Sequence, residues 1–147
     1  MKVKEIMTSQ VRSFSPDLNA REALNILREL EISGLPVVDA QGKLVGMLTE
    51  KEILAYLLPS YIDKVGSFIY EDNPKAVKKK AAFLNEVKVS QVMRKDVLTI
   101  NEDAALCEVA RTMLTQKARR LPVVDKEGKV VGIIARCDIL KAIISGI

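Results

Sequence analysis

Hydrophobic positions in this chain follow one pattern twice. Residues 35–48 and residues 121–134 each contain an apolar run that begins Leu-Pro-Val-Val-Asp, a polar turn with a glycine, and a second apolar run. In such turns the aspartate carboxylate accepts backbone N–H groups, and the glycine adopts the positive φ that closes the turn. Each copy therefore predicts a β-hairpin.

A strand and a helix are expected before each hairpin. Apolar and polar residues alternate over Val11–Phe14 and over Val97–Ile100, which predicts two short, half-buried strands. Apolar residues then recur at helical spacing, from Ala20 to Leu30 and from Leu106 to Met113. Both copies therefore begin with the order β-α-β-β.

Capping residues suggest where the helices begin. Ser15–Asp17 supplies a proline and side-chain oxygens ahead of the first helix, and Asn101 or Asp103 is expected to cap its counterpart. Short amphipathic helices are expected after the hairpins, over Glu50–Leu58 and Arg136–Ser145. Each copy is therefore predicted to be a β-α-β-β-α unit.

The two copies form an ungapped internal repeat. Val3–Leu57 aligns with Val89–Ile143 at a constant offset of 86 residues, and 16 of the 55 aligned residues are identical. So small a unit buries too little surface to be stable alone, and we expect the two to pack about a pseudo-two-fold axis. The predicted fold class is α+β, with small mixed sheets and flanking helices. We expect repeat 1 over residues 1–58, an insert over 59–88 and repeat 2 over 89–147.

Gly46 and Gly132 occupy equivalent positions inside predicted strands. Glycine weakens a strand, and it is usually found there because another group approaches the backbone closely. Two explanations are open at this point: tight packing between the repeats, or room for a ligand.

The composition is that of a globular protein with little catalytic or metal-binding chemistry. The chain has 147 residues, a net charge of +4, a pI near 9.1 and a mean hydropathy of +0.11. It contains no histidine, the commonest general base and zinc ligand, so no metal site is expected. Cys107 and Cys137 are too few for a disulfide framework, and we expect two part-buried, reduced thiols. No signal peptide or membrane span is visible, and a cytoplasmic protein is expected.

The insert between the repeats has two parts. Tyr61–Tyr70 contains two of the three tyrosines of the chain, and Pro74–Val87 is predicted to be helical. An apolar stripe on this helix would consist of Ala76, Val77, Ala81 and Leu84, and its lysines are Lys75, Lys78, Lys79 and Lys80. Lysines beside such a stripe favour a solvated face over a nucleic-acid site, because no aromatic residue interleaves with them to stack on bases.

The repeated motif resembles that of CBS (cystathionine β-synthase) domains, and the two copies resemble a tandem pair, or Bateman module. The resemblance rests on Leu-Pro-Val-Val-Asp, x-x-Gly-Lys, (Leu/Val)-Val-Gly and a helix that contains Ile-Leu, each present twice. The openings Val3–Met7 and Val89–Met93 also match. The resemblance covers about 110 residues, everything except the insert and the chain ends.

This resemblance implies regulation by a small ligand. Such pairs bind adenine nucleotides or related adenosyl compounds between their repeats and regulate an enzyme or a channel. We therefore expect a freestanding, energy-sensing regulator that binds AMP, ADP, ATP or S-adenosylmethionine, needs no other cofactor, and signals to an unidentified protein. A homodimer is expected, as in the family, and the slightly positive mean hydropathy is consistent with it.

The family's ligand motif, Ser/Thr-x-x-Asp between the last strand and the last helix, is divided between the repeats. Repeat 1 keeps the hydroxyl at Thr49 but has Glu52 for the aspartate, whereas repeat 2 keeps Asp138 but has Ala135 for the hydroxyl. In the family this aspartate accepts hydrogen bonds from both ribose hydroxyls, and basic residues before Leu-Pro-Val contact phosphate. The resemblance implies these nucleotide-binding residues: Asp138, Arg136, Ala135, Arg119, Arg120, Leu121 and Pro122 in repeat 2, and Thr49, Glu52, Leu35 and Pro36 in repeat 1. We expect the Asp138 cleft to bind more strongly.

Two alternatives to ligand sensing are open. A structural or protein-interaction pair without a ligand is the first, because neither repeat has the complete motif. Nucleic-acid binding through the lysines of the insert is the second. An enzyme is not expected, because the chain has no phosphate-binding loop, no Gly-x-Gly-x-x-Gly and no nucleophile–histidine pair. A membrane partner is not expected either.

Overall fold

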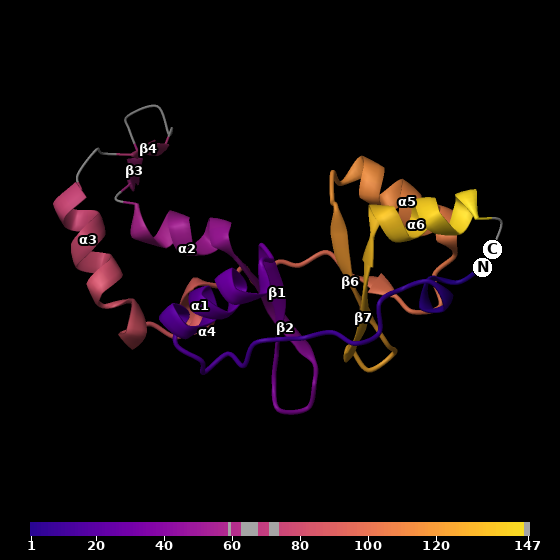
Figure 1. The fold of residues 1–147 in the computed structure, drawn as a ribbon, viewed down its shortest axis with the longest axis horizontal. Helices are drawn as coiled ribbons and strands as arrows, with labels where there is room; N and C mark the ends of the chain where they lie inside the picture. The colour runs from indigo at the N-terminus through magenta and orange to yellow at the C-terminus, as the bar shows by residue number, and fades with distance from the viewer. Residues whose placement is uncertain (59, 63–67, 71–73, 146–147) are drawn as a thin grey trace. The chain divides into compact units, whose positions relative to one another are not determined.

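The computed structural model describes residues 1–58, 60–62, 68–70 and 74–145 (Figure 1). Repeat 1 contains η1 (Val3–Glu5), α1 (Ala20–Leu30), β1 (Gly34–Val38), β2 (Leu44–Thr49) and α2 (Glu50–Leu57). The insert contains β3 (Ser60–Ile62), β4 (Phe68–Tyr70), α3 (Pro74–Ala82) and η2 (Leu84–Glu86). Repeat 2 contains α4 (Val89–Val92), β5 (Ile100–Asn101), α5 (Leu106–Thr115), β6 (Arg120–Val124), β7 (Val130–Ala135) and α6 (Arg136–Ile144). The α+β fold class is confirmed.

The sheets are small and mixed, as predicted. In repeat 2, β5 runs parallel to β6, and β6 runs antiparallel to β7. Repeat 1 has a two-stranded sheet of β1 and β2, and a single parallel bridge joins Phe14 to Val37. That bridge is the counterpart of the parallel pair Ile100 and Val123 in repeat 2.

The strands predicted before the helices are too long. Of Val11–Phe14, only Phe14 joins a sheet, and its N–H donates to the carbonyl of Pro36 at 2.9 Å. Of Val97–Ile100, only the last residue belongs to β5. The alternation of apolar and polar residues is present in both segments. A residue enters a sheet, however, only where a neighbouring strand pairs with its backbone.

The caps of α1 and α5 also differ from the prediction. The Asn19 side chain accepts the N–H of Glu22 at 2.9 Å, and α1 begins directly after Asn19. Ser15 instead closes a turn, in which its hydroxyl accepts the N–H two residues later. Asn101 closes a similar turn before α5, whose N-cap position is Ala105. These side-chain oxygens satisfy nearby backbone groups in turns and so are not available to the helices.

Each hairpin turn has the predicted chemistry. Asp39 Oδ1 accepts the N–H groups of Gln41 and Lys43 at 2.9 and 3.0 Å. Asp125 accepts the equivalent pair of N–H groups at the same two distances. The turn glycines Gly42 and Gly128 both have φ of 82°, a conformation that glycine adopts without strain.

The two turns are joined by backbone hydrogen bonds. The Leu44 N–H donates to the carbonyl of Gly128, and the Val130 N–H donates to the carbonyl of Gly42, both at 3.1 Å. An antiparallel bridge between Lys43 and Lys129 lies between these two bonds. The turn of repeat 1 therefore belongs to the same compact unit as repeat 2.

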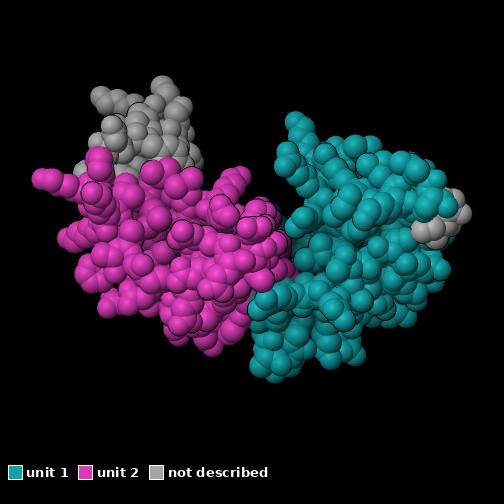
Figure 2. Space-filling model, in the orientation of Figure 1, with its two compact units in different colours: residues 1–13, 38–45, 96–147 teal, residues 14–37, 46–95 magenta. Residues whose placement is uncertain are grey.

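The chain forms two compact units, and each unit contains segments from both sequence repeats (Figure 2). One unit contains residues 1–13, 38–45 and 96–147, and the other contains residues 14–37 and 46–95. The opening segment of repeat 1 thus lies in the unit of repeat 2, and the opening segment of repeat 2 lies in the unit of repeat 1. The sequence did not predict this exchange.

Backbone hydrogen bonds and burial hold each opening segment in place. The Val3 N–H donates to the carbonyl of Ala104 at 2.9 Å, and the Val89 N–H donates to the carbonyl of Leu18 at 2.7 Å. Val3 and Val89 are both fully buried. Val3 belongs to a core cluster with Ile100, Val109, Met113, Leu121, Val123, Ile134 and Ile139. Each repeat therefore supplies a core residue to the unit of the other.

The opening segments also account for the two strand glycines. A Cβ on Gly46 would lie 2.5 Å from the Sδ atom of Met93 and 2.9 Å from the carbonyl oxygen of Arg94. A Cβ on Gly132 would meet the Met7 side chain and a backbone carbonyl in the same way. A backbone carbonyl does not move aside cheaply, so glycine is needed at both positions. Of the two explanations, tight packing of chain segments is the one that the contacts support.

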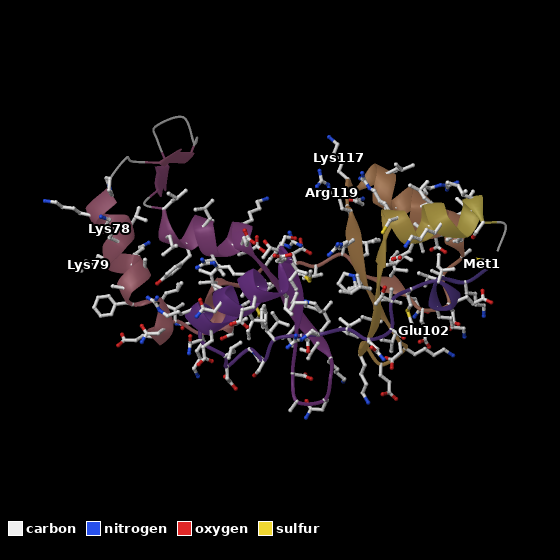
Figure 3. The ribbon with its side chains drawn as sticks, in the orientation of Figure 1. Met1, Lys78, Lys79, Glu102, Lys117 and Arg119 are labelled. Carbon is white, nitrogen blue, oxygen red and sulfur yellow. The ribbon has the colours of Figure 1, made fainter. Side chains whose placement is uncertain are left out.

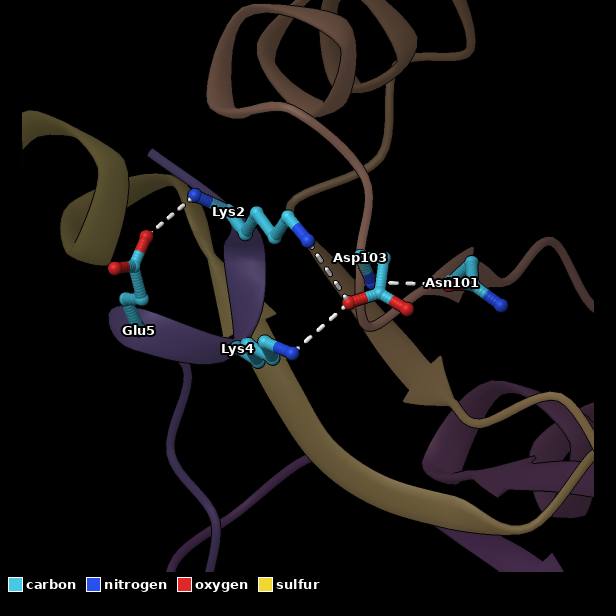
Figure 4. A network of polar contacts seen from close by, with 5 residues as sticks. All are labelled: Lys2, Lys4, Glu5, Asn101 and Asp103. Carbon is cyan, nitrogen blue, oxygen red and sulfur yellow. Dashed lines mark hydrogen bonds and ion pairs between the residues drawn. The ribbon is translucent and has the colours of Figure 1, made fainter.

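Two lysines of the first opening segment converge on Asp103 (Figure 4). The Nζ atoms of Lys2 and Lys4 lie 3.5 and 3.0 Å from Asp103 Oδ1. The hydrogen bond to Asp103 and its negative charge raise the pKa of Lys4, and the Lys4 hydrogen bond lowers the pKa of Asp103. Lys88 and Asp17, at the equivalent sequence positions, form an ion pair of 3.6 Å in the other unit. Matching ion pairs therefore accompany both exchanged segments.

The second part of the insert is helical, as predicted. Leu84 is buried, and the other members of the predicted stripe, Ala76, Val77 and Ala81, are half-buried. The four lysines are exposed, and Lys80 donates to the carbonyl of Tyr56 at 3.1 Å, with Nζ 5.0 Å from the centre of the Tyr56 ring. Residues 63–67 of the first part lie outside the described residues.

Cys107 and Cys137 are free and exposed, so the expectation of part-buried thiols is wrong. Both lie in the first turn of a helix, at positions that face away from the core cluster. Within residues 1–58, 60–62, 68–70 and 74–145, no group of three or more His, Cys, Asp or Glu could hold a metal ion. None of the helices in these ranges has the length and apolarity that a bilayer span requires.

Candidate functional site

In repeat 2, three elements meet at the open end of the hairpin: the start of β6, the end of β7 and the first turn of α6. Arg120 pairs with Ala135 across the two strands. The Arg136 N–H donates to the carbonyl of Arg119 at 3.1 Å, which ties α6 to the residue before β6. We call this group, residues 117–120 and 135–138, the repeat-2 edge. Leu121 and Pro122, also expected from the sequence, are buried directly after it.

Asp138 lies in the first turn of α6 and is half-buried. Its Oδ2 atom accepts the N–H of Ala135 at 2.8 Å, so the carboxylate caps the helix. Its Oδ1 atom has no hydrogen-bond partner among the described residues. The carboxylate therefore keeps acceptor capacity for a further donor while it holds the helix start in place.

The cations of the repeat-2 edge are open to solvent. Arg119, Arg120 and Arg136 are exposed, and the Nε–H of Arg136 donates to the carbonyl of Ala118 at 3.1 Å. That bond leaves both terminal nitrogens of the Arg136 guanidinium free to donate. Lys117 and Arg119 extend beyond the start of β6 in Figure 3. Lys117 was not among the residues expected from the sequence, although the basic run from Lys117 to Arg120 was a visible signal for it.

Repeat 1 has an equivalent edge, residues 31–34 and 49–52. The Glu50 N–H donates to the carbonyl of Ser33 at 2.9 Å, as the Arg136 N–H does to Arg119. Glu52 Oε1 accepts both the hydroxyl of Thr49 at 2.7 Å and its N–H at 3.2 Å. The Thr49 hydroxyl thus donates within the protein. The predicted residues Leu35 and Pro36 are buried immediately after this edge.

One contact explains why an arginine is present at the start of β6 and absent at the start of β1. A Cβ on Gly34 would lie 2.5 Å from Thr49 Cγ2 and 2.8 Å from the carbonyl oxygen of Leu48. In repeat 2 the equivalent residues are Arg120 and Ala135, where the side chain that faces the arginine is small. A threonine at the end of the second hairpin strand therefore excludes an arginine at the start of the first. This contact links the Thr49/Ala135 difference to the Gly34/Arg120 difference, and the other differences between the edges are independent of it.

The structure brings the expected residues together in two separate sets. Asp138, Ala135 and the three arginines lie in one compact unit with Leu121 and Pro122, and Thr49, Glu52, Leu35 and Pro36 lie in the other. Each set offers a carboxylate at a helix start, with backbone amides of the first turn directed toward the helix N-terminus. Both arrangements suit a ligand with hydroxyl groups, and only the set with the three arginines also suits negative charge.

A family model described as "CBS domain" matches the chain twice, over residues 3–59 and 89–145. Inosine-5′-monophosphate dehydrogenase from Methanocaldococcus jannaschii is 36% identical over 140 residues; the match covers 95% of this chain and 23% of that enzyme. An uncharacterized protein of the same archaeon is 31% identical, with 98% of this chain and 92% of that protein covered. The chloroplastic CBS domain-containing protein CBSX1 from Arabidopsis thaliana is 33% identical and is covered over 63% of its length.

Solved structures of similar fold include two with bound adenosyl compounds. CBSX2 from Arabidopsis thaliana, in complex with AMP, is 28% identical with a TM-score of 0.73, and the match covers 98% of this chain and 96% of that one. The CBS domain pair of protein MJ0100, in complex with 5′-methylthioadenosine and S-adenosyl-L-methionine, is 26% identical with a TM-score of 0.67. That match covers 100% of this chain and 98% of the other.

Proposed function

Because both copies of its repeat match the same domain model, this chain belongs to the CBS domain family, and we propose that it is a non-catalytic regulator that binds an adenine nucleotide or another adenosyl compound. The observation that carries this proposal is the Asp138 carboxylate, which has one oxygen free at a helix start beside three exposed arginines. The expected ligand class is AMP, ADP, ATP or S-adenosylmethionine.

The chemistry of the repeat-2 edge suits such a ligand. A ribose presents two adjacent hydroxyl donors, and a carboxylate accepts both more strongly than a neutral group does. Arg119 and Arg136 present planar guanidinium groups, which bind phosphate oxygens in pairs. The residues that follow, Leu121 and Pro122, are buried and anchor the start of β6 directly behind these polar groups.

Similar proteins support the proposal. The structures of CBSX2 with AMP and of the MJ0100 pair with two adenosyl compounds have matching folds along nearly the whole of this chain. The repeat-1 edge is proposed to bind more weakly, because the Thr49 hydroxyl already donates to Glu52 and this edge has no arginine. We propose residues 1–58 and 89–147 as the two CBS repeats of the regulator and residues 59–88 as an insert between them.

Thermal unfolding with a ligand panel tests this function. A ligand at about 100 times its Kd stabilises the folded state by about 2.7 kcal/mol, which raises Tm by roughly 5–10 °C for a chain of this length. We expect a rise with at least one of AMP, ADP, ATP and S-adenosylmethionine. If none of the four compounds raised Tm at millimolar concentration, the hypothesis of a protein-interaction pair without a ligand would be favoured.

A matched pair of variants tests the site. Asp138→Asn keeps a side-chain oxygen that can accept the Ala135 N–H, so the helix cap is retained, but it loses the charge and one acceptor. Glu52→Gln makes the same change at the repeat-1 edge. For AMP, we expect Asp138→Asn to remove most of the ligand-induced rise in Tm and Glu52→Gln to remove little of it. Equal rises in the wild type and Asp138→Asn would show that Asp138 is not the ribose-binding residue.

The regulator is further proposed to act as a homodimer that contacts a partner protein. The apolar side chains of α6 support this: Leu140, Ile143 and Ile144 are 57%, 61% and 81% exposed. Exposed apolar residues clustered on one helix are typical of an interaction surface. Light scattering should give twice the monomer mass for the wild type and the monomer mass for Ile143→Lys. A monomeric wild type at all concentrations would refute the dimer.

A further inference from the structure

The two edges differ in net charge, and two pairs of equivalent positions, Glu31 with Lys117 and Glu50 with Arg136, have opposite charges. Repeat 2 has four cations and one carboxylate, whereas repeat 1 has three carboxylates and one lysine. The equivalent pairs, repeat 1 first, are Glu31 and Lys117, Ser33 and Arg119, Gly34 and Arg120, Glu50 and Arg136, Lys51 and Cys137, and Glu52 and Asp138. The charge difference therefore arises at several positions and does not depend on a single substitution.

These charges are placed on matching backbones. Glu31 and Lys117 are the only non-glycine residues with positive φ among the described residues, and both have φ of 55°. Glu50 and Arg136 each begin a helix and donate their N–H to the residue before the first hairpin strand, at 2.9 and 3.1 Å. A ligand held in the same way at the two edges would therefore meet opposite charges at the same places.

Neither set of charges is neutralised by a neighbour. In the part of the chain that the structure describes, no acidic side chain lies within ion-pair distance of Lys117 or the three edge arginines. The same holds for basic side chains around Glu31 and Glu50. Unpaired charges of this kind attract or repel an ionic ligand, and because the groups are exposed the effect weakens as salt is raised.

We propose that the two edges select adenosyl ligands of opposite charge: the repeat-2 edge takes a 5′-phosphorylated adenosine, and the repeat-1 edge takes an adenosyl compound without phosphate. This inference rests on the proposed function. The phosphate dianion is attracted by Lys117, Arg119 and Arg136, which also supply N–H donors to its oxygens. At the repeat-1 edge the carboxylates of Glu31 and Glu50 repel a phosphate, and they favour a neutral nucleoside or a sulfonium cation.

AMP and adenosine separate the contribution of phosphate, because they have the same base and ribose. By isothermal titration calorimetry at low salt we expect AMP to bind at least roughly tenfold more tightly than adenosine, since each hydrogen bond to a charged group contributes a factor of this order or more. The preference should fall as salt is raised. S-adenosylmethionine should differ from AMP either in the number of sites that it fills or in the edge at which it binds.

Charge-exchange variants assign the preference to the edges. Lys117→Glu with Arg119→Ser places the repeat-1 residues at the repeat-2 edge, and it should remove the preference for AMP while adenosine binding changes less than twofold. Glu50→Arg should weaken S-adenosylmethionine binding and leave the tighter AMP site unchanged. Lys126→Glu is the matched control: Lys126 is exposed in the turn at the other end of β6 and β7, and the preference should be retained.

Each result has a distinct meaning. Failure of all adenosyl compounds to bind the wild type removes the proposed function, and this inference with it. Binding of AMP and adenosine with equal affinity, or a preference that survives in Lys117→Glu with Arg119→Ser, overturns the charge selection and leaves the proposed function intact. Loss of the preference in Lys126→Glu as well would show that net charge, and not the edge, attracts the phosphate.

Discussion

Replacement of Val3 by alanine tests the exchange of opening segments. Val3 is fully buried in the core cluster of the unit that contains repeat 2. Alanine removes two buried methyl groups, each worth about 0.8 kcal/mol, and leaves a small cavity. We expect the free energy of unfolding to fall by about 2 kcal/mol and Tm to fall by about 4–8 °C.

Hydrogen exchange, read by mass spectrometry, locates this loss. In Val3→Ala, amides of β6, β7 and α5 should exchange faster, although Val3 belongs to repeat 1 by sequence. Val89→Ala should have the mirror effect on α1, because Val89 is fully buried in the same unit and its N–H donates to Leu18, two residues before that helix. Leu114→Ala is the control, since Leu114 is 72% exposed and its loss should leave both units unchanged. If Val3→Ala instead made the amides of α1 exchange their hydrogens faster and left those of α5 unaffected, the proposed swap of opening segments would be refuted.

Two further substitutions test local packing and charge. Gly34→Ala should cost about 1–3 kcal/mol in chemical denaturation, because its Cβ meets both the Thr49 side chain and the carbonyl oxygen of Leu48. Thr49→Ala in the same chain removes only the first contact and should restore part of the loss; an equally unstable double variant would mean that the backbone alone sets the limit. The lowered pKa of Asp103 contributes stability at neutral pH that is lost as pH falls through that pKa. Asp103→Asn should therefore lose less stability than the wild type below about pH 4, and an identical acid profile would show that its pair with Lys4 adds nothing.

The hairpins were predictable because their chemistry is local. Asp39 and Gly42 lie within one turn, so their spacing alone indicates both the hydrogen bonds and the positive φ. Helix α2 was predicted to within one residue, over Glu50–Leu58 against the observed Glu50–Leu57. The exchange was not predictable, because an apolar pattern around Val3 shows that the residue is buried and says nothing about which repeat buries it.

The sequence predicted that the candidate site residues would lie together, their role in binding stays a prediction, and the contacts that constrain them were not predictable. The sequence identified Asp138 and the arginines through the family motif, and the structure places them at one hairpin end. The sequence did not reveal the contact between Gly34 and Thr49, because these residues are 15 positions apart and become adjacent only through the strand register. Lys117 was missed because its relevance depends on a backbone turn, which a count of charges does not reveal.

Synthesis of the chain from its N-terminus gives the exchanged segments a further consequence. The unit of residues 14–37 and 46–95 has all its parts once residue 95 is made, whereas residues 1–13 have no core to join until residues 96–147 follow. Val3 and Val109 are more than 100 residues apart, and contacts so distant in sequence form slowly. We expect nascent chains that end near residue 95 to expose Lys2 and Lys4 to protease while their α1 is already protected. Residues 1–13 would then be made before the rest of both units and be among the last to find their place in the fold.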